Sequence, residues 1–179
     1  MSQFDLRLAT FDDIPAIEAL IAASVNGLQA GDYSEAQRSA ALGSVFGVDR
    51  SLIGDGTYFV ILCEDVLVAC GGWSKRRKLY GGDNVEGKDD ALLDPLVDAA
   101  RIRAFFVHPE WARRGLGGQL LSAGEQAARA AGFTRLELGA TLTGIPLYER
   151  YGFLAMERSE VPLPNGATLG ILKMWKPIP

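Results

Sequence analysis

The pattern of apolar and polar residues predicts a strand, two helices and a hairpin in the first half of the chain. Apolar and polar residues alternate over residues 4–8, which is typical of a strand. Residues 14–21 place large aliphatic side chains on one helical face, and a Ser-x-x-Gln capping box opens a second helix, which we expect over about residues 34–46. The apolar, β-rich runs 57–63 and 66–73 are separated by two residues and predict a hairpin.

The second half shows the same succession of strands and helices. Residues 102–107 are rich in β-branched and aromatic side chains and predict a strand, which His108-Pro109 ends because proline cannot donate to a ladder. From Leu116 to Ala131 apolar residues recur at helical spacing, and Gly132 suits the end of a helix. The remaining predicted elements are a strand over 134–139, a short helix over 145–151 and a closing hairpin of 156–163 and 169–175.

Two stretches depart from regular patterns. Gly71-Gly72 at the end of the first hairpin suggests a β-bulge or a close approach of backbone. Residues 74–98 have no regular pattern and predict a long loop, whose basic run 75–78 we expect to lie on a solvated surface. With no linker or repeat in the sequence, we expect one domain over residues 1–179.

Composition narrows the class of protein. The formal net charge of -4 over 179 residues argues against a nucleic-acid-binding protein, which is more often basic. No apolar run approaches the length needed to span a membrane, and the N-terminus lacks the pattern of a secretory signal. Cys63 and Cys70 fall in predicted strands, where we expect buried, unpaired thiols. We therefore expect a cytoplasmic protein without a metal site.

The junction of the central strand with the long helix carries the strongest chemical signal. The first N–H groups of a helix have no internal partner, and its dipole favours an anion there. Gly115, Gly117 and Gly118 would let a phosphate approach this backbone, and Arg113 and Arg114 would add positive charge. The alternative is that the glycines only form a tight turn. A Rossmann dinucleotide site is disfavoured, because Leu120 occupies its third glycine position.

This junction resembles the acetyl-CoA motif of the GNAT superfamily of N-acetyltransferases, Gln/Arg-x-x-Gly-x-Gly/Ala, which aligns with residues 112–117. Ala112 departs from the usual Gln or Arg. The resemblance implies a three-layer α/β fold: a central, mostly antiparallel sheet of about seven strands with a parallel splayed pair, flanked by about four helices. It also implies that acetyl-CoA is the cosubstrate and that its pantetheine arm pairs with backbone near Phe106 and Val107.

A second element of the family also has a counterpart. Its Asn-containing loop, Phe/Leu-Tyr-Glu helix and Gly-Phe pair correspond to Thr143, 147–149 and 152–153, with threonine in place of asparagine. The resemblance implies a set of residues for binding acetyl-CoA: Phe106, Val107, Arg113, Arg114, Gly115, Leu116, Gly117, Gly118, Thr143 and Tyr148.

The implied reaction is direct attack of a neutral primary amine on the thioester. Tyr148 is the candidate acid for the leaving thiolate, and the alternative is that it only packs against the cofactor. Where many relatives have a glutamate base, this chain has Arg101 or Arg103, and we expect His108 to be structural. A non-catalytic acyl-CoA-binding domain is the alternative from another class of function.

The sequence leaves the acceptor and the oligomeric state open. Tyr33, Trp73, Arg101 and Arg103 are candidate substrate residues. Two arginines two residues apart on a strand share a face, and guanidinium suits the capture of an anionic group, so an amino-acid-like amine is one hypothesis. The alternative is that both arginines pair with nearby acidic residues. The acceptor is expected to be a small-molecule or peptide amine, and the protein a monomer or homodimer.

Overall fold

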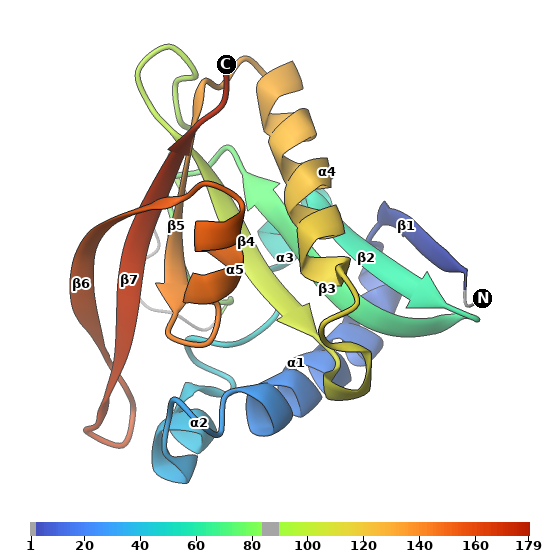
Figure 1. Cartoon of the computed structure of the whole chain (residues 1–179), viewed down its shortest axis with the longest axis vertical. Helices are drawn as coiled ribbons and strands as arrows, with labels where there is room; N and C mark the ends of the chain where they lie inside the picture. Colours follow the sequence, from blue (N-terminus) through green and yellow to red (C-terminus); the bar gives the residue numbers. More distant parts are fainter. Residues whose placement is uncertain (1–2, 84–89) are drawn as a thin grey trace.

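The fold is built on one mixed sheet. The computed structural model describes residues 3–83 and 90–179, and its strands follow the order β1-β2-β3-β4-β5-β7-β6 (Figure 1). The strands are β1 (Phe4–Leu8), β2 (Tyr58–Cys63), β3 (Val66–Ser74), β4 (Ala100–Val107), β5 (Arg135–Thr141), β6 (Leu154–Pro162) and β7 (Thr168–Pro177). Neighbouring strands are antiparallel except β4 and β5, which confirms the predicted sheet with one parallel pair.

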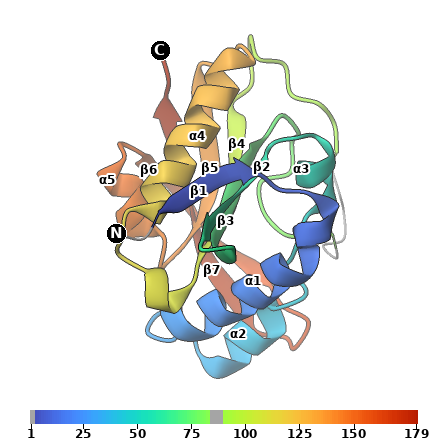
Figure 2. The same ribbon diagram turned by 90° about the vertical axis from the view of Figure 1, so that its right-hand side faces the viewer.

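Helices cover both faces of the sheet and complete three layers, as Figure 2 shows. One face, here called the α1 face, carries α1 (Ile14–Leu28), α2 (Glu35–Ala41) and α3 (Arg50–Gly54). The opposite α4 face carries α4 (Leu116–Ala130) and α5 (Ile145–Arg150). The short 3-10 helices Phe11–Asp13 and Pro109–Trp111 precede α1 and α4.

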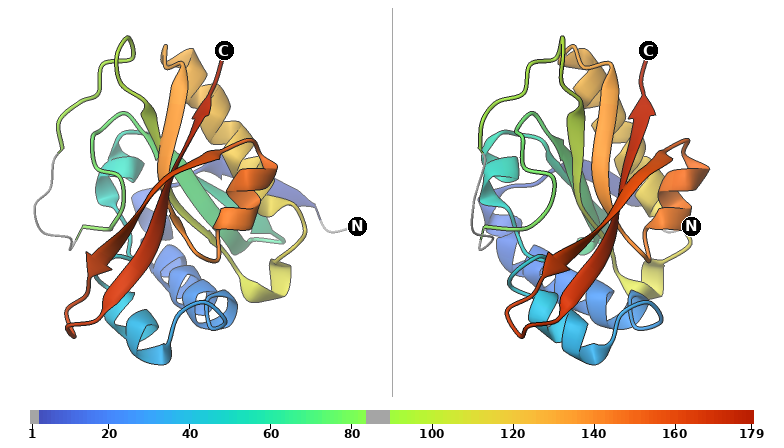
Figure 3. Two further views of the ribbon diagram at one scale, coloured as in Figure 1. Left: turned by 60° about the vertical axis from the view of Figure 1, so that its left-hand side comes forward. Right: turned by 90° about the vertical axis from the view of Figure 1, so that its left-hand side faces the viewer.

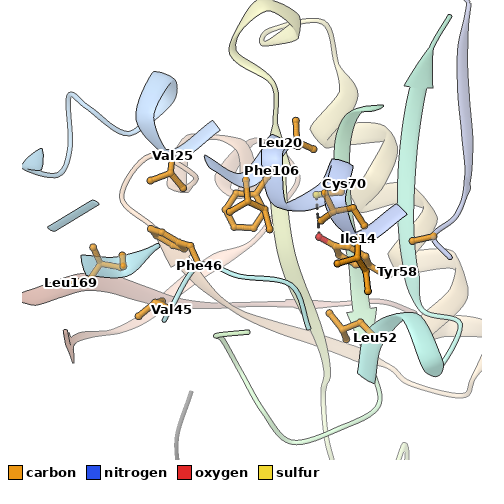
Figure 4. Close-up of a cluster of buried hydrophobic side chains, with 14 of the residues drawn as sticks. Ile14, Leu20, Val25, Val45, Phe46, Leu52, Tyr58, Cys70, Phe106 and Leu169 are labelled. Carbon is orange, nitrogen blue, oxygen red and sulfur yellow. Dashed lines mark hydrogen bonds between the residues drawn. The ribbon is translucent and has the colours of Figure 1, made fainter. Parts of the chain in front are cut away.

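Each face has its own hydrophobic core. On the α1 face, Ile14, Leu20 and Val25 of α1 belong to one buried cluster with Phe106 of β4, as drawn in Figure 4. Beneath α4, Leu121 and Ala128 join apolar residues of β4, β5 and β7. The sheet is thus buried on both sides around β4, the strand on which the predicted site depends.

The structure corrects the predicted helices after α1. The second helix ends at Ala41 rather than near Phe46, because Leu42 adopts an extended backbone and Gly43 has φ +80°. The Phe46 N–H then returns to Ala41 O at 2.9 Å in a turn. The helix α3 was not predicted; Asp49 caps it by accepting from the Ser51 N–H at 3.1 Å.

The loop after β3 lies closer to the sheet than the sequence suggested. Arg76 forms an ion pair with Asp55 at 2.7 Å, and Lys78, whose side chain is 9% exposed, forms one with Asp49 at 3.5 Å. The expectation of a fully solvated basic run was therefore wrong for Lys78. The carbonyl oxygens of residues 77, 78 and 81 accept hydrogen bonds from two arginines of β4, so the loop is attached to the α1 face.

Candidate functional site

The parallel pair β4–β5 opens shortly after it begins. The two strands pair only at Ala100–Leu136 and Arg101–Glu137, although β4 continues to Val107 and β5 to Thr141. Figure 1 shows the two strands diverging beyond this point, and Figure 3 shows them side by side only at one end. The divergence leaves the facing edges of both strands without the ladder that parallel strands normally share. We call this opening the splay.

Val107 presents its backbone to the splay. It lies opposite Ala69 of β3, and the next residue, His108, donates its N–H to Val68 O at 2.9 Å. In an antiparallel ladder this makes Val107 a non-hydrogen-bonded position, so its own N–H and C=O point away from β3. An extended chain in the splay would find one donor and one acceptor there. Phe106 lies opposite Cys70 and alternates to the other edge.

A bulge in β4 changes which side chains line each face. Arg103 lies opposite Gly72 and Phe106 opposite Cys70, so Ala104 and Phe105 together face Gly71 alone. Ala104 has φ +56°, an unusual value for a residue with a side chain. Because of the extra residue, Phe106 joins the core on the α1 face, whereas Phe105 packs on the α4 face. The expected irregularity at Gly71-Gly72 is confirmed.

The N-terminus of α4 has the features of an anion site. Gln119 is the first residue to make the regular helical bond, to Gly115 O at 3.1 Å, so the preceding N–H groups of the first turn lack a helical acceptor. No side chain caps this end. Gly115 has φ +82°, which glycine adopts without strain, and Arg113 and Arg114 are exposed beside it. The arrangement fits a pyrophosphate at a helix N-terminus.

Two of the three glycines also allow α5 to approach α4. A Cβ at Gly117 would lie 2.9 Å from Leu147 Cδ2, and one at Gly118 would lie 1.9 Å from the Tyr151 hydroxyl oxygen. Both contacts are shorter than real Cβ contacts. The helix that carries Tyr148 is therefore packed directly against the first turn of α4. Close helix packing is therefore a reason for glycine at positions 117 and 118 that does not depend on binding an anion.

Tyr148 is enclosed by aromatic rings on the α4 face. Its ring centroid is 6.2 Å from Phe105 of β4 and 5.7 Å from Phe153. The side chain is buried, and burial raises the pKa of its hydroxyl. Within residues 3–83 and 90–179, no group hydrogen-bonds with this hydroxyl. The structure therefore holds a neutral phenol next to the strand that borders the splay.

The loop after β5 is connected to the turn between α1 and α2. Thr143 Oγ1 donates to Asp32 at 2.7 Å. The Tyr33 hydroxyl donates to Gly170 O at 2.7 Å and accepts from the Leu142 N–H at 2.9 Å. Tyr33 is thereby buried as a link between β7 and the loop, and Thr143 already has a partner in Asp32.

The two arginines of β4 share the α1 face, as expected, and both are paired. Arg101 forms an ion pair with Glu137 of β5 and donates to Arg77 O at 3.2 Å. Arg103 is 3% exposed and forms an ion pair with Asp49 at 3.1 Å. Their acidic partners come from the neighbouring strand and from the N-cap of α3. These pairs occupy the guanidiniums that an anionic acceptor would need.

Two other sequence candidates have structural roles. Trp73 is 6% exposed beneath α4, where its ring meets Phe133 at 6.0 Å, so its position gives a substrate role no support. His108 accepts from the Glu110 N–H at 3.3 Å and caps the 3-10 helix before α4. In the described ranges, no group of three or more His, Cys, Asp or Glu side chains could hold a metal ion, and no helix could cross a membrane.

A pocket of about 400 Å³ opens on the α1 face between α1 and the segment that follows α2. Its wall includes Phe46, whose ring meets Phe106 of β4 edge-to-face at 5.9 Å. Glu18, Asp83 and Arg50 also line the pocket, and the last two form an ion pair at 3.6 Å. The pocket lies next to the residue of β4 that precedes Val107.

Comparison with known proteins identifies the family. The acetyltransferase (GNAT) family model matches residues 28–153, and the chain belongs to this family. The chain is an acyl-CoA-dependent N-acyltransferase with the GNAT fold, and acetyl-CoA is its cosubstrate. Among curated proteins, no sequence matches significantly.

Solved structures agree with this assignment. A GCN5-related N-acetyltransferase from Rhodopseudomonas palustris is 25% identical, with a TM-score of 0.73 and coverage of 99% of this chain and 98% of that one. The paia N-acetyltransferase of Thermoplasma acidophilum, solved with coenzyme A, is 13% identical (TM-score 0.68, coverage 98% and 99%). The ribosomal-protein-S18-alanine N-acetyltransferase of Escherichia coli is 18% identical (TM-score 0.59, coverage 98% and 94%). The last two show likeness of fold alone.

Proposed function

We propose that this enzyme transfers the acetyl group of acetyl-CoA to a primary amine by direct attack while both substrates are bound. The observation that carries the proposal is the splay beside an uncapped helix N-terminus. The splay binds an extended arm through backbone groups, and the helix N-terminus binds a pyrophosphate. When bound, acetyl-CoA supplies an activated acetyl thioester.

The chain's own residues divide the work of binding. The first-turn N–H groups of α4 hold the pyrophosphate, and the exposed guanidiniums of Arg113 and Arg114 add charge to that site. The backbone of Val107 orients the arm in the splay. Catalysis then rests mainly on holding two reactants in line, which removes much of the entropy cost of their meeting.

Tyr148 is the proposed acid. Its hydroxyl remains protonated because burial raises its pKa, so it can give a proton to the departing thiolate sulfur. The aromatic rings around it exclude water from that proton transfer. The strand position where many relatives have a glutamate base has paired arginines, so we propose that the amine loses its proton to water.

The pocket on the α1 face supports a cationic rather than an anionic acceptor. Its lining includes two carboxylates and one guanidinium, and Glu18 has no ion-pair partner among the described residues. Arg101 and Arg103 are held by Glu137 and Asp49. We therefore favour amines that carry a second positive charge over the amino-acid-like amines suggested by the sequence.

Two assays test the proposal. Thermal-shift measurements with acetyl-CoA, CoA, NAD and ATP should show stabilisation by acetyl-CoA and CoA alone. Release of free thiol from acetyl-CoA should then be followed with diamines, amino acids and short peptides as acceptors. Stabilisation without thiol release from any amine would favour a non-catalytic acyl-CoA-binding domain. Preference for amino acids over diamines would contradict the acceptor class.

A further inference from the structure

The β4 bulge has a partner deep in the core of the α1 face. Ala104 keeps its left-handed backbone although it has a Cβ, and most residues with a Cβ avoid that conformation. The Tyr58 hydroxyl donates to Ala104 O at 2.8 Å. Tyr58 belongs to β2, so this bond reaches across β3 to the bulge.

Cys70 completes the arrangement. Its sulfur lies 3.1 Å from the Tyr58 hydroxyl oxygen, the contact drawn as a dashed line in Figure 4. Burial raises the pKa of the Cys70 thiol to about 12, so the sulfur stays a neutral thiol, which is a weak acceptor for the Tyr58 hydroxyl. It therefore competes little with Ala104 O for the single phenolic proton of Tyr58.

The surrounding glycines make room for this geometry. A Cβ at Gly71 would lie 2.4 Å from the ring of Phe105, and one at Gly72 would lie 2.2 Å from Thr57 O. The bulged strand and β2 therefore approach β3 more closely than side chains would permit. The hydroxyl of Tyr58 is the one side-chain donor that the described residues direct at the carbonyl of the bulge.

We propose that Tyr58 is a positioning residue for acyl-CoA binding, acting through Ala104 O to hold the bulge that turns the edge of Val107 toward the splay. Tyr58 itself does not touch the ligand. Without the bulge, the alternation along β4 would shift by one residue. The N–H and C=O of Val107 would then point toward β3, and those of its neighbour would face the splay. This inference rests on the proposed function, since it assumes that the splay receives the pantetheine arm.

Binding of two ligands separates this role from general stability. CoA carries the pantetheine arm, whereas 3′-phosphoadenosine 5′-diphosphate has the same nucleotide and pyrophosphate without it. We expect Tyr58→Phe to raise the Kd for CoA at least fivefold and to leave the Kd for the nucleotide within twofold. Thr57→Val is the matched control, because it removes a neighbouring buried hydroxyl, which bonds Leu52 O at 3.2 Å outside the bulge.

A rescue variant makes the test specific. Glycine adopts φ +56° without strain, so Ala104→Gly should hold the bulge without the hydrogen bond. We expect the double variant Tyr58→Phe/Ala104→Gly to recover CoA affinity to within twofold of wild type. Equal weakening of both ligands, unchanged CoA affinity in Tyr58→Phe, the same loss in Thr57→Val, or absence of rescue would each overturn the inference. If wild-type protein binds neither ligand, the proposed function fails and the inference falls with it.

Discussion

Arg101 and Glu137 are the last residues at which β4 and β5 pair, and their side chains form an ion pair at that same point. Backbone and side chains thus close the splay together at one end. Lys173 of β7 also lies near Glu137, at 3.5 Å. The carboxylate therefore holds cations from both neighbouring strands, and these side chains are at most 27% exposed.

This geometry predicts unequal costs for the two partners. Glu137→Gln leaves two cations facing each other and should lower the free energy of unfolding by about 2 kcal/mol. Arg101→Gln leaves Glu137 paired with Lys173 and should cost about 1 kcal/mol. Urea denaturation of both single variants and the double variant measures the coupling between them. Equal losses that add without coupling would contradict the paired arrangement.

Replacing Gly117 tests the anion site. Gly117→Val should weaken CoA binding by more than tenfold, because a branched side chain at the first turn of α4 blocks the approach of the pyrophosphate. The same side chain would also press on Leu147, so displacement of α5 is the competing explanation.

The variant Leu147→Ala separates the two explanations. It removes the side chain that the new Cβ would meet and gives α5 room. If Gly117→Val/Leu147→Ala still binds CoA more than tenfold weaker than Leu147→Ala alone, the loss arises at the ligand. Full recovery of affinity, measured by calorimetry, would assign the glycine to helix packing.

Removing the phenol of Tyr148 should affect turnover more than binding. We expect Tyr148→Phe to lower kcat by roughly 100-fold, with the KM for acetyl-CoA changed less than threefold, because an acid acts in the transition state. Burial raises the pKa of this hydroxyl, so it stays protonated as pH rises to 9, and the ratio of wild-type to variant kcat should be constant from pH 6 to 9. Full turnover in the variant would leave Tyr148 a packing role only.

Asp49 should be critical for stability. It pairs with buried Arg103 and with Lys78, so Asp49→Asn leaves an uncompensated charge and should cost about 3 kcal/mol. The control Asp55→Asn disrupts the more exposed pair with Arg76 and should cost about 1 kcal/mol. Similar losses in the two variants, measured by urea denaturation, would contradict the difference in burial.

The same carboxylate makes stability depend on pH. Burial alone would raise the pKa of Asp49, but the Ser51 hydrogen bond and the charges of Arg103 and Lys78 outweigh it, and the pKa is lowered. A lowered folded-state pKa stabilises the protein above the unfolded value near 3.9, and this contribution is lost as pH falls through the folded value. Wild type should therefore lose more stability than Asp49→Asn between pH 5 and pH 3.

Local sequence patterns predicted most strands and the bare N-terminus of α4. The parallel pair was predicted from the family resemblance. Local patterns could not place the splay, because the point where β4 leaves β5 depends on pairing across the sheet. Simple alternation would also put Phe105, not Phe106, on the face of Arg103. The one signal of the bulge was Gly71-Gly72 on the neighbouring strand, since nothing local marks Ala104 for a positive φ.

The partners of the arginines were equally hidden. Arg103 and Asp49 are far apart in the sequence, and no helix was predicted around residue 50 to place the carboxylate. Tyr33 illustrates the opposite case: its residue type fitted a substrate role, but the fold uses its hydroxyl to join β7 with the loop after β5. Residue types indicated chemistry, whereas long-range contacts decided which side chains remain available for it.

The bonds from Asp32 to Thr143 and from Tyr33 to Leu142 have a thermodynamic consequence. The turn between α1 and α2 cannot shift without pulling on the loop that follows β5. A ligand that immobilises one segment therefore pays part of the ordering cost of the other. Two substrates that bind against these segments should each raise the affinity for the other by the same factor, as linkage requires. In this protein a single pair of hydroxyl groups would thus make the affinity for each substrate respond to the binding of the other.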